Sequence, residues 1–557
     1  MWGPAVQLYA LRSPRNWGMG DFGDLRQLVG DWAALGADIV GLNPLHALFL
    51  DDPARASPYS PSTRQWLNAL YLEVEAIEDF AECGEARRLV QAPGFQARLA
   101  QLRASQLVDY AGVAAAKLEV LERLYAYFRA RHLETDSPSG RAFREFQARG
   151  GAALRRHALF EALQASHRAA DPAVRGWQGW RAEYRDPDGE AVARFAREQV
   201  VRIEFYEYLQ WQAERQLSEA GECRASRQLG VGLYLDLAVS VDGAGSDAWS
   251  NQRGYAPGVG IGAPPDDFSP QGQDWGLPPL RPDRLRAQHY APLRQALARG
   301  MRAAGALRID HVMGLLRLFW VPAGAAARDG AYVHYRMDEQ LAIVALESHR
   351  NRCLVIGEDL GTVPDEARRQ LAQLGALSCR LLYFERRHDG EFRPGAEYPP
   401  EALVAVGSHD LPTLAGWWAG RDLEWWRDLG LCPAGEPYER RRAERARDRL
   451  RLVQALQREG LLSPDPGAEA VAAQPLDPAV AEAAQAFLAA SPAQVMMVQL
   501  EDVLGVAEQA NLPGTTEAHP NWRRKLPATL EALREDPRVV ETARRLAALR
   551  PGWRLRR

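Results

Sequence analysis

The stretch "ALRIDHVMGLL" (306–316) places an arginine, an aspartate and a histidine where a short apolar run ends. Burying a charged group is costly unless the group has a partner, so the stretch predicts either a structural ion pair or a reactive site. If it is a β-strand, its side chains alternate, with Arg308 and Asp310 on one face and His311 on the other. A guanidinium beside Asp310 would favour the ionised form of that carboxyl group.

Seven further apolar runs of similar length accompany this one. In order, the eight runs are "AVQLYAL" (5–11), "DIVGLNPL" (38–45), "VGLYLDLAV" (231–239), "GALRIDHV" (305–312), "CLVIGEDL" (353–360), "CRLLYFE" (379–385), "LVAVGSHD" (403–410) and "VMMVQLED" (495–502). Unbroken apolar runs are typical of parallel strands buried on both faces, although runs this short also fit buried helices. Because most are followed by helix-like or loop sequence, the pattern predicts an α/β fold, a (β/α)8 TIM barrel with large, mainly helical insertions between barrel elements.

Two segments between these runs are much longer than simple barrel connections. The first, residues 46–230, contains "VAAAKLEVLERLYAYFRARHL" (113–133) and "REQVVRIEFYEYLQWQAERQL" (197–217), whose apolar residues recur at helical spacing. We expect a helical subdomain inserted into a barrel loop. The second, around 420–490, carries the Arg/Glu-rich "YERRRAERARDRLRLVQALQREG" (438–460), which we interpret as a solvated helix face rather than a binding patch.

The composition argues against several classes of function. The chain has 557 residues, of which 46% are hydrophobic and 25% charged, as in ordinary globular proteins. A net charge of −4 does not indicate binding to nucleic acid or to an anionic membrane. The five cysteines lie far apart without a CxxC pair, so we expect neither a disulfide framework nor a zinc site. No signal peptide precedes the first run and no run is long enough to span a bilayer, so we expect a cytoplasmic protein.

Three of the runs end in polar clusters, at the end of a barrel strand where active sites lie. The clusters are "RIDH" (308–311), "GED" (357–359) and "SHD" (408–410), with a weaker one in "QLED" (499–502). A retaining glycosidase needs two carboxyl groups about 5–5.5 Å apart, one as nucleophile and one as acid/base. Asp310 beside Arg308 fits the ionised nucleophile, and Glu358 after an apolar run fits an acid of raised pKa. Asp410 would then bind sugar hydroxyls as the ring flattens.

Each of these carboxylates also has a less specific interpretation. A single acidic residue at a strand end more often caps a helix or forms an ion pair, and this is our interpretation of Asp359 and Asp502. A set of His311, Glu358, Asp359, His409 and Asp410 could also bind a divalent metal ion in a metal-dependent barrel enzyme, although it lacks a tight pair such as HxH. The coincidence of three clusters favours the glycosidase interpretation.

Longer segments around these clusters carry a resemblance. They are "NWGMGDFGDL" (16–25), "SPYSPSTRQWLNALYLEVE" (57–75), "GAPPDDFSPQGQDWGLPPL" (262–280), "ALRIDHVMGLLRLFWVP" (306–322), "VIGEDLGTVP" (355–364), "GSHDLPTLAGWW" (407–418) and "NLPGTTEAHPNWRRKL" (511–526). In this order they resemble the 4-α-glucanotransferases, the amylomaltase or disproportionating-enzyme family, nearly from end to end. The resemblance implies that Asp310 is the nucleophile, that Glu358 is the acid/base, and that Asp410 stabilises the transition state.

The resemblance also implies a set of substrate-binding residues. Around the transferred sugar these are Arg308, His311, His409, Tyr59 and Asn68. A loop overhanging the cleft, "GAPPDDFSPQGQDWG" (262–276), would add Asp266, Phe268, Gln273 and Trp275. Without the motif, core packing is the alternative for Phe268 and Trp275. Weaker candidates are Asn511 and Trp522, together with Asp242, for which Asp247 is the alternative.

The implied reaction moves a segment of an α-1,4-glucan to the 4-hydroxyl of an acceptor glucan or glucose, by a retaining double displacement without metal or cofactor. The implied partners are malto-oligosaccharides and α-1,4-glucans, with glucose as acceptor; neither nucleic acid nor a membrane is expected, and the sequence does not indicate an oligomeric state. An α-amylase-like retaining hydrolase is an alternative because both reactions share the covalent intermediate. A non-catalytic glucan-binding barrel is another.

The expected organisation along the chain has five parts. They are 1–75 (first barrel strands with the donor-site loop), 76–230 (mainly helical inserted subdomain), 231–419 (central barrel with the catalytic strands), 420–490 (helical insertion) and 491–557 (last barrel strand, substrate-loop block and C-terminal helices). Many bacterial relatives carry an additional N-terminal domain. Here the first expected strand lies near residue 5, so that domain is expected either to be absent or to be missing through truncation.

Overall fold

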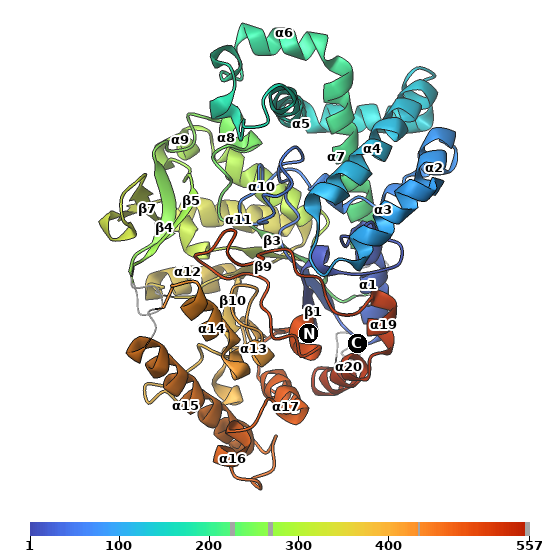
Figure 1. The fold of residues 1–557 in the computed structure, drawn as a ribbon. Coiled ribbons are helices and arrows are strands. Elements are labelled where there is room, and N and C mark those ends of the chain that lie inside the picture. The colour runs from blue at the N-terminus through green and yellow to red at the C-terminus, as the bar shows by residue number, and fades with distance from the viewer. Residues whose placement is uncertain (223–228, 266–270, 362, 433–434, 552–557) are drawn as a thin grey trace.

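A closed barrel of parallel strands forms the centre of the protein (Figure 1). The computed structural model describes residues 1–222, 229–265, 271–361, 363–432 and 435–551. Within them the barrel strands are β1 (Trp2–Val6), β2 (Ile39–Leu42), β3 (Gly232–Leu237), β6 (Ala306–Ile309), β9 (Leu354–Gly357), β10 (Leu377–Leu381), β11 (Ala402–Ala405) and β12 (Val495–Gln499). They close in the order β1-β12-β11-β10-β9-β6-β3-β2. Each predicted apolar run overlaps one of these strands, which confirms the TIM barrel.

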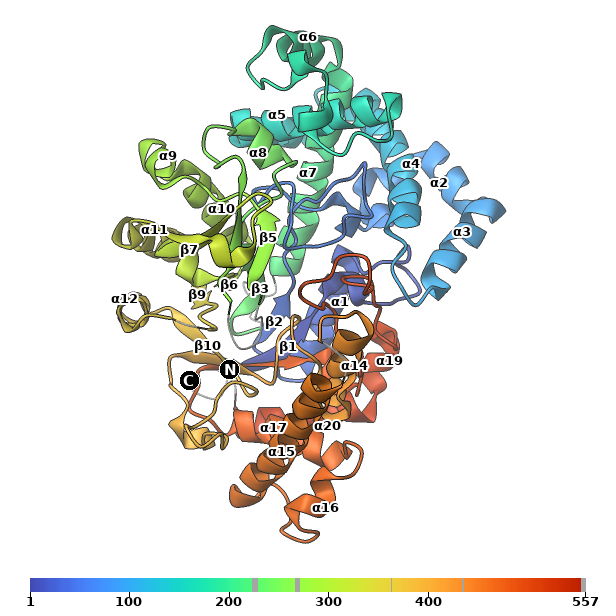
Figure 2. The ribbon, with the colours of Figure 1, turned by 60° about the vertical axis from the view of Figure 1, so that its left-hand side comes forward.

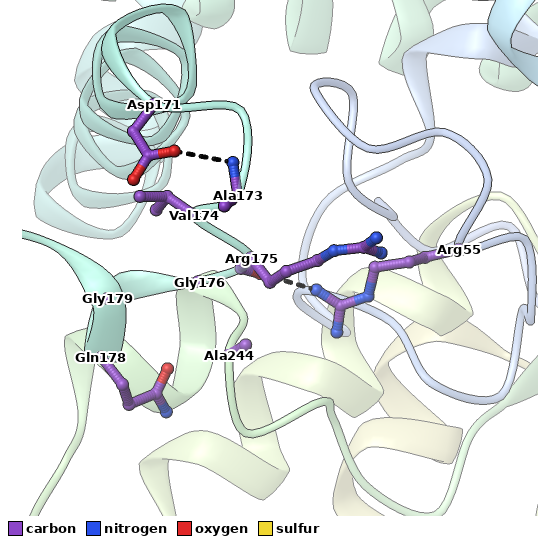
Figure 3. Close-up of a pocket in the computed structure, with 9 residues that line it drawn as sticks. All are labelled: Arg55, Asp171, Ala173, Val174, Arg175, Gly176, Gln178, Gly179 and Ala244. Carbon is purple, nitrogen blue, oxygen red and sulfur yellow. Dashed lines mark hydrogen bonds between the residues drawn. The ribbon is translucent and has the colours of Figure 1, made fainter.

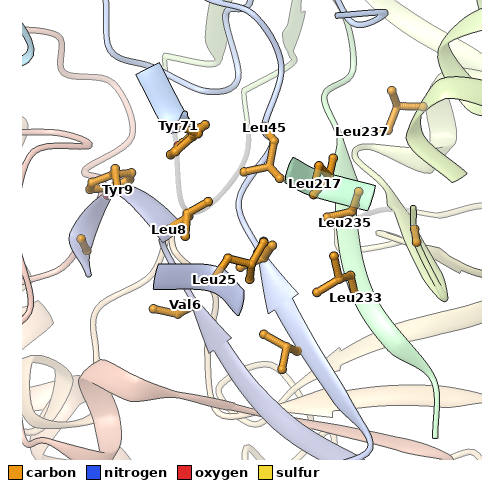
Figure 4. Close-up of a cluster of buried hydrophobic side chains, with 14 of the residues drawn as sticks. Val6, Leu8, Tyr9, Leu25, Leu45, Tyr71, Leu217, Leu233, Leu235 and Leu237 are labelled. Atoms are coloured by element: carbon orange, nitrogen blue, oxygen red, sulfur yellow. The ribbon is translucent and has the colours of Figure 1, made fainter. Parts of the chain in front are cut away.

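Alternation along the strands separates two hydrophobic cores. On β3, Leu233 and Leu235 point outward and pack with Leu25 and Leu217, which belong to covering helices α1 (Phe22–Ala34) and α7 (Val200–Gly221) (Figure 4). Tyr234 points inward and belongs to the cluster that fills the barrel. Since strand residues alternate, the next inward position after Tyr234 is residue 236, at the carboxyl end of the strand. The barrel interior thus ends in a polar layer.

A large helical insertion follows β2 and precedes β3. Its helices are α2 (Gly84–Gln91), α3 (Pro93–Ala104), α4 (Tyr110–Phe128), α5 (Pro138–Ala170), α6 (Glu190–Glu198) and α7. The two predicted helical patterns overlap α4 and α7. Figures 1 and 2 show this group beyond one side of the barrel, opposite the helices near the C-terminal half. The insertion is therefore attached to the loop that leads out of β2.

Buried polar side chains of the insertion hold that loop in place. Gln210 of α7 donates to and accepts from the backbone of Leu67, at 2.8 and 2.9 Å. Gln216 does the same to Glu73, at 2.9 Å in both directions. Lys117 of α4 donates to two carbonyl oxygens between them, each at 2.7 Å. Since buried backbone groups need partners, these side chains fix residues 67–73 as a neighbouring strand would.

A second, four-stranded sheet lies outside the barrel, in the order β5-β4-β7-β8. Its strands are β4 (Val259–Ala263), β5 (Gln273–Leu277), β7 (Arg317–Pro322) and β8 (Ala331–His334). The interpretation of 262–276 as a loop is wrong at both ends, because residues 262–263 belong to β4 and residues 273–276 belong to β5, which pairs antiparallel with β4. This edge strand carries Gln273 and Trp275.

The remaining helices cover the barrel and extend its C-terminal half. They are α8 (Ser246–Ser250), α9 (Pro282–Ala287), α10 (Ala291–Arg302), α11 (Met337–Asn351), α12 (Asp365–Leu374), α13 (Leu414–Ala419), α14 (Arg421–Asp428), α15 (Glu436–Arg458), α16 (Ala468–Ala472), α17 (Pro478–Ala489), α18 (Leu500–Val503), α19 (Leu530–Glu535) and α20 (Pro537–Leu549). The Arg/Glu-rich α15 is more than a solvated face, because Arg445 donates to both oxygens of buried Asp422 at 2.8 Å. No helix in the described ranges combines the length and apolar character needed to traverse a bilayer.

Candidate active site

Arg308 occupies the centre of the polar layer at the carboxyl ends of the strands. Its Nη1 lies 2.8 Å from both carboxylate oxygens of Asp236. Its Nη2 lies 2.8 Å from Oδ1 of Asp310 and 4.0 Å from Oε2 of Glu358. The side chain of Arg308 is 13% exposed, so these charges meet in a largely buried environment. Two of the predicted catalytic carboxylates, from different strands, therefore lie within 4.0 Å of one guanidinium nitrogen.

The strand alternation explains how Arg308 and Asp310 meet. Ala306 belongs to the inner core and Leu307 to the outer one, so residues 308 and 310 point inward as predicted. The backbone N–H of Asp310 donates to the carbonyl of Leu237 at 3.0 Å and continues the pairing with β3. His311 departs from the alternation, since the strand ends at Ile309 and its backbone is left-handed with φ of 45°.

Glu358 follows β9 and is held by the backbone. Its Oε2 accepts from the N–H of His311 at 3.0 Å, and its Oε1 from the N–H of Leu360 at 2.7 Å. Burial raises the pKa of Glu358 to about 7, and the neighbouring Asp310 contributes to the rise although Arg308 and the two N–H groups oppose it. A carboxyl group with this pKa can give and take a proton near neutral pH, as an acid/base requires.

Asp410 lies beside His409 and Asn511. Its Oδ2 is 3.3 Å from Nε2 of His409, and its Oδ1 accepts from the amide of Asn511 at 2.6 Å. Desolvation opposes ionisation of Asp410, but His409 and Asn511 outweigh it and lower its pKa to about 2. Burial disfavours the imidazolium of His409, yet the Asp410 carboxylate raises the pKa of His409 above its ordinary value. Each group thus favours the charged form of the other.

Three aromatic rings form a wall beside these groups. Tyr59 stacks on His409 with ring centroids 4.7 Å apart and an interplanar angle of 21°. Trp522 lies against both, at 5.4 Å from Tyr59 and 5.5 Å from His409. The hydroxyl of Tyr59 donates to Oδ2 of Asp236 at 2.5 Å, which ties the wall to Arg308. An apolar face next to buried charges is a typical sugar-binding arrangement.

The outer sheet reaches the same site through β5. The ring of Trp275 packs edge-on against His311, with centroids 5.3 Å apart, and its Nε1 donates to Oε1 of Gln273 at 2.9 Å. These contacts join two of the predicted substrate-binding residues, Gln273 and Trp275, to a third, His311. Asp266 and Phe268 lie outside the described residues.

Comparisons with known proteins agree with this geometry. The model of a family described as 4-alpha-glucanotransferase matches residues 6–530. The chain belongs to the 4-alpha-glucanotransferase family. It is similar to the 4-alpha-glucanotransferases of Haemophilus influenzae (40% identity, 94% of this chain and 75% of the relative) and Mycobacterium tuberculosis (37%, 98% and 75%). The crystal structure of amylomaltase from Corynebacterium glutamicum is similar at a TM-score of 0.85, with 31% identity over 98% of this chain and 75% of that one.

Two residues that the 4-alpha-glucanotransferase resemblance suggested lie away from these contacts. Asn68 is 2% exposed, and its Oδ1 accepts from the N–H of Leu70 to begin a single turn of helix. Asp242 forms an ion pair with Arg55 and accepts from the N–H of Ala244 at 2.8 Å. In the described ranges no hydrogen bond or ion pair links either residue to the three carboxylates. Their contacts with sugar stay predictions.

A cavity of about 460 Å³ lies beside Arg55, apart from the carboxylates. Figure 3 shows Arg55 reaching toward the backbone of Arg175, to which it donates at 3.0 Å. The lining residues are Arg55, Asp171, Ala173, Val174, Arg175, Gly176, Gln178, Gly179 and Ala244. None of the predicted site residues is among them.

The structural interpretation of two other acids is confirmed. Asp359 accepts from the N–H of Cys379 at 2.8 Å and pairs with Arg380 at 3.4 Å. Asp502 accepts from the N–H of Leu414 at 2.6 Å, at the start of α13. Across the described residues, no group of three or more His, Cys, Asp or Glu side chains is arranged as a metal site.

The sequence analysis missed Asp236, the residue that joins Arg308 to Tyr59. The resemblance to the family instead suggested Asp242 or Asp247, which lie further along the loop. A signal was present, because Asp236 is the single charged residue in the apolar run 231–239 and lies at the strand position equivalent to Arg308. A buried charge in a barrel strand needs a partner, and its neighbour across the ladder provides one.

Substituting Asp236 tests this joining role. We expect Asp236→Asn to lower kcat/KM for a malto-oligosaccharide by about 10-fold to 10²-fold, because Arg308 loses its charged anchor and shifts toward Asp310. Steady-state kinetics on maltotriose would measure the loss. Asp422→Asn is the matched control, since Asp422 is also buried and also accepts from one arginine, Arg445, at 2.8 Å. Equal losses in the two variants would contradict the role.

Proposed function

We propose that the protein cleaves an α-1,4 bond in a malto-oligosaccharide and transfers the donor segment to the 4-hydroxyl of an acceptor glucan or of glucose. The observation that carries the mechanism is the position of Asp310 and Glu358 around one guanidinium nitrogen. Asp310 is paired with Arg308, whereas burial raises the pKa of Glu358 to about 7. The two carboxyl groups thus have the separate environments that a nucleophile and an acid/base need.

In the first step, Asp310 attacks the anomeric carbon of the donor sugar. A bond forms between a carboxylate oxygen and this carbon while the bond to the glycosidic oxygen breaks. Glu358 gives its proton to that oxygen, and the remainder of the glucan leaves as an alcohol. The product is a β-linked glucosyl ester on Asp310, and Glu358 is ionised.

In the second step, the acceptor replaces the leaving group. Glu358 removes the proton from the acceptor 4-hydroxyl, whose oxygen attacks the anomeric carbon. The ester bond to Asp310 breaks, and Glu358 is again protonated. Two inversions give net retention, so the new linkage is α.

The surrounding residues support the charge that develops on the sugar. Ionised Asp410 is placed by His409 and Asn511, and it can accept hydrogen bonds from sugar hydroxyls in the transition state. The partly exposed ring of Tyr59, with the buried Trp522 packed against it, offers apolar surface to which the face of a glucose unit can bind. Arg308 keeps Asp310 oriented through their 2.8 Å ion pair. Transfer to a sugar rather than to water agrees with the family, because the chemistry at Asp310 and Glu358 is the same for both acceptors.

Incubation with maltotriose tests the proposal. Disproportionation predicts a ladder of longer oligosaccharides together with glucose, while the number of reducing ends stays constant. Chromatography and a reducing-end assay measure the two quantities. Products no longer than the substrate, with a steady gain of reducing ends, would indicate a hydrolase. Tight binding without turnover would indicate a glucan-binding barrel.

We also propose a cytoplasmic location. Its support is the cysteine pattern, in which five widely separated residues without a CxxC pair suit a reducing compartment.

A further inference from the structure

Residues 509–522 form a closed segment that brings two side chains to the site. At one end Asn511 donates to Oδ1 of Asp410 at 2.6 Å. At the other end the ring of Trp522 lies against Tyr59 and His409. The two ends are joined, because the N–H of Trp522 donates to the carbonyl of Ala510 at 3.0 Å. A group that holds this segment in place therefore holds both the Asn511 contact and the Trp522 contact in place.

The side chain of Asn521 is the centre of that segment. Its Oδ1 accepts from the N–H of Leu512 at 2.8 Å and lies 2.6 Å from Nδ1 of His519. Its Nδ2 donates to the carbonyl and the hydroxyl of Thr515, at 3.0 and 2.8 Å. An amide has two donor and two acceptor positions, and all four are used inside the segment. Asn521 is 8% exposed, so it is part of the interior of the segment.

The backbone conformation of Trp522 shows that the segment needs the support that the Asn521 side chain gives. Trp522 has φ of 60°, a left-handed conformation that is unfavourable for a bulky residue and persists when its surroundings enforce it. Asn521 fixes it from the preceding position. From the following side, the hydroxyl of Tyr110 in α4 donates to the Trp522 carbonyl at 2.6 Å. The indole can then lie against the other two rings of the wall.

We infer that Asn521 is a positioning residue for the transfer reaction, acting through Asn511 on Asp410 and through Trp522 on the aromatic wall. The inference rests on the proposed function, because it assigns these contacts to the binding of the transferred sugar. Leu512, which Asn521 binds, adjoins Asn511, and Asn521 itself adjoins Trp522. Loss of the Asn521 amide would therefore release both ends of the segment.

An effect that passes through Asn511 to Asp410 distinguishes positioning from support of the fold. The groups that face Asp410 are His409, Arg308 and the Asn511 amide, with the hydroxyl of Tyr59 nearby. The hydrogen bond from Asn511 favours the ionised carboxylate, so its loss raises the pKa of Asp410. Because the pKa of Asp410 in the wild-type protein is about 2, this change lies below the pH range of the assay, and coupling to Asn511 provides the readout instead. If Asn521 acts through Asn511, Asn521→Leu costs less activity when Asn511 has already been changed to alanine, whereas a general loss of stability costs the same factor in both backgrounds.

The test measures kcat/KM on maltotriose for three variants and the wild-type protein, with Asn521→Leu also made in an Asn511→Ala background. Asn521→Leu removes all four contacts at similar volume, and we expect kcat/KM to fall by about 10²-fold in the wild-type background and by clearly less in the Asn511→Ala background. Asn521→Asp keeps the two acceptor contacts, and we expect a smaller fall. Asn351→Leu is the matched control, since Asn351 donates to the carbonyl of Glu347 in α11, away from the site, and wild-type kinetics are expected.

Each outcome decides the inference. A folded Asn521→Leu variant with wild-type kcat/KM would overturn it, as would an equal fold-loss of activity in the wild-type and Asn511→Ala backgrounds. If Asn521→Leu does not fold, Asn521→Asp decides, and wild-type kcat/KM in that variant overturns the inference. Failure of the wild-type protein to disproportionate maltotriose would instead overturn the proposed function, so the two failures are distinguishable.

Discussion

Replacing Asp310 with alanine is expected to lower the rate of maltotriose disproportionation by about 10⁴-fold or more, because no glucosyl ester can form without its carboxylate. The fold should survive the change. Arg308 keeps its two 2.8 Å contacts with Asp236 and stays near Glu358, so its charge is not left unpaired. Thermal unfolding checks the fold and product analysis checks the rate. Asp283→Ala, at an exposed residue paired with Arg281, is the control and should leave the rate unchanged.

Rescue by azide separates the role of Asp310 from that of Glu358. In Asp310→Ala the anion can enter the vacated space and attack the anomeric carbon of an α-glycosyl fluoride, expelling fluoride. Attack from that side inverts the configuration at the anomeric carbon and gives a β-glycosyl azide. In a Glu358 variant, azide would instead attack the ester on Asp310 and give the α-azide. An α-azide from Asp310→Ala would show that another group is the nucleophile.

The barrel could be predicted because its physical signal is local. A parallel strand buried on both faces needs an unbroken apolar run, and the polar residues that end such a run must face the site or a partner. This is why the run at 353–360 indicated Glu358 before any contact was known. The helix α4 was predictable for a similar reason, since it buries an apolar stripe against its neighbours. The helix α7 has apolar residues at the same spacing, but the fold buries it on every side from Ile203 to Ala213, including polar residues such as Gln210.

The remaining site residues depend on pairings that join distant segments. Asp236 matters because Arg308 is its ladder neighbour, and a single run does not show which strands are adjacent. Residues 273–276 looked like a loop because their Gly and Pro neighbours hide a strand that forms only against β4. Asn521 lies in a block of the family resemblance, yet its four contacts exist only once the segment has closed. Asn68 shows the opposite case, a polar residue whose structural role as a helix cap is local.

The second large effect is expected at Glu358. Glu358→Gln removes the proton that the leaving oxygen needs, and we expect kcat/KM on maltotriose to fall by about 10²–10⁴-fold. In the wild-type protein the acid must be protonated, and burial raises its pKa to about 7, so kcat/KM should decline as the pH rises above about 7. The variant has no such proton to lose, and its residual activity should lack this limb. Initial rates across pH measure both effects, and an unchanged basic limb in Glu358→Gln would assign it to another group.

The raised pKa of Glu358 also predicts that the stability of the fold depends on pH. In the folded protein the pKa of Glu358 is raised from 4.5 to about 7, so above pH 7 the fold must hold a carboxylate that burial disfavours, whereas the unfolded chain ionises freely. This penalty, about 3 kcal/mol, disappears as the pH falls below about 4.5, where both states are protonated. The free energy of unfolding of Glu358→Gln minus that of the wild type should therefore increase from pH 5 to pH 8. Denaturant titrations at the two pH values measure the difference. A gap that does not change with pH would mean that Glu358 is ionised in the fold at neutral pH, and Glu358 could then not serve as the proton donor.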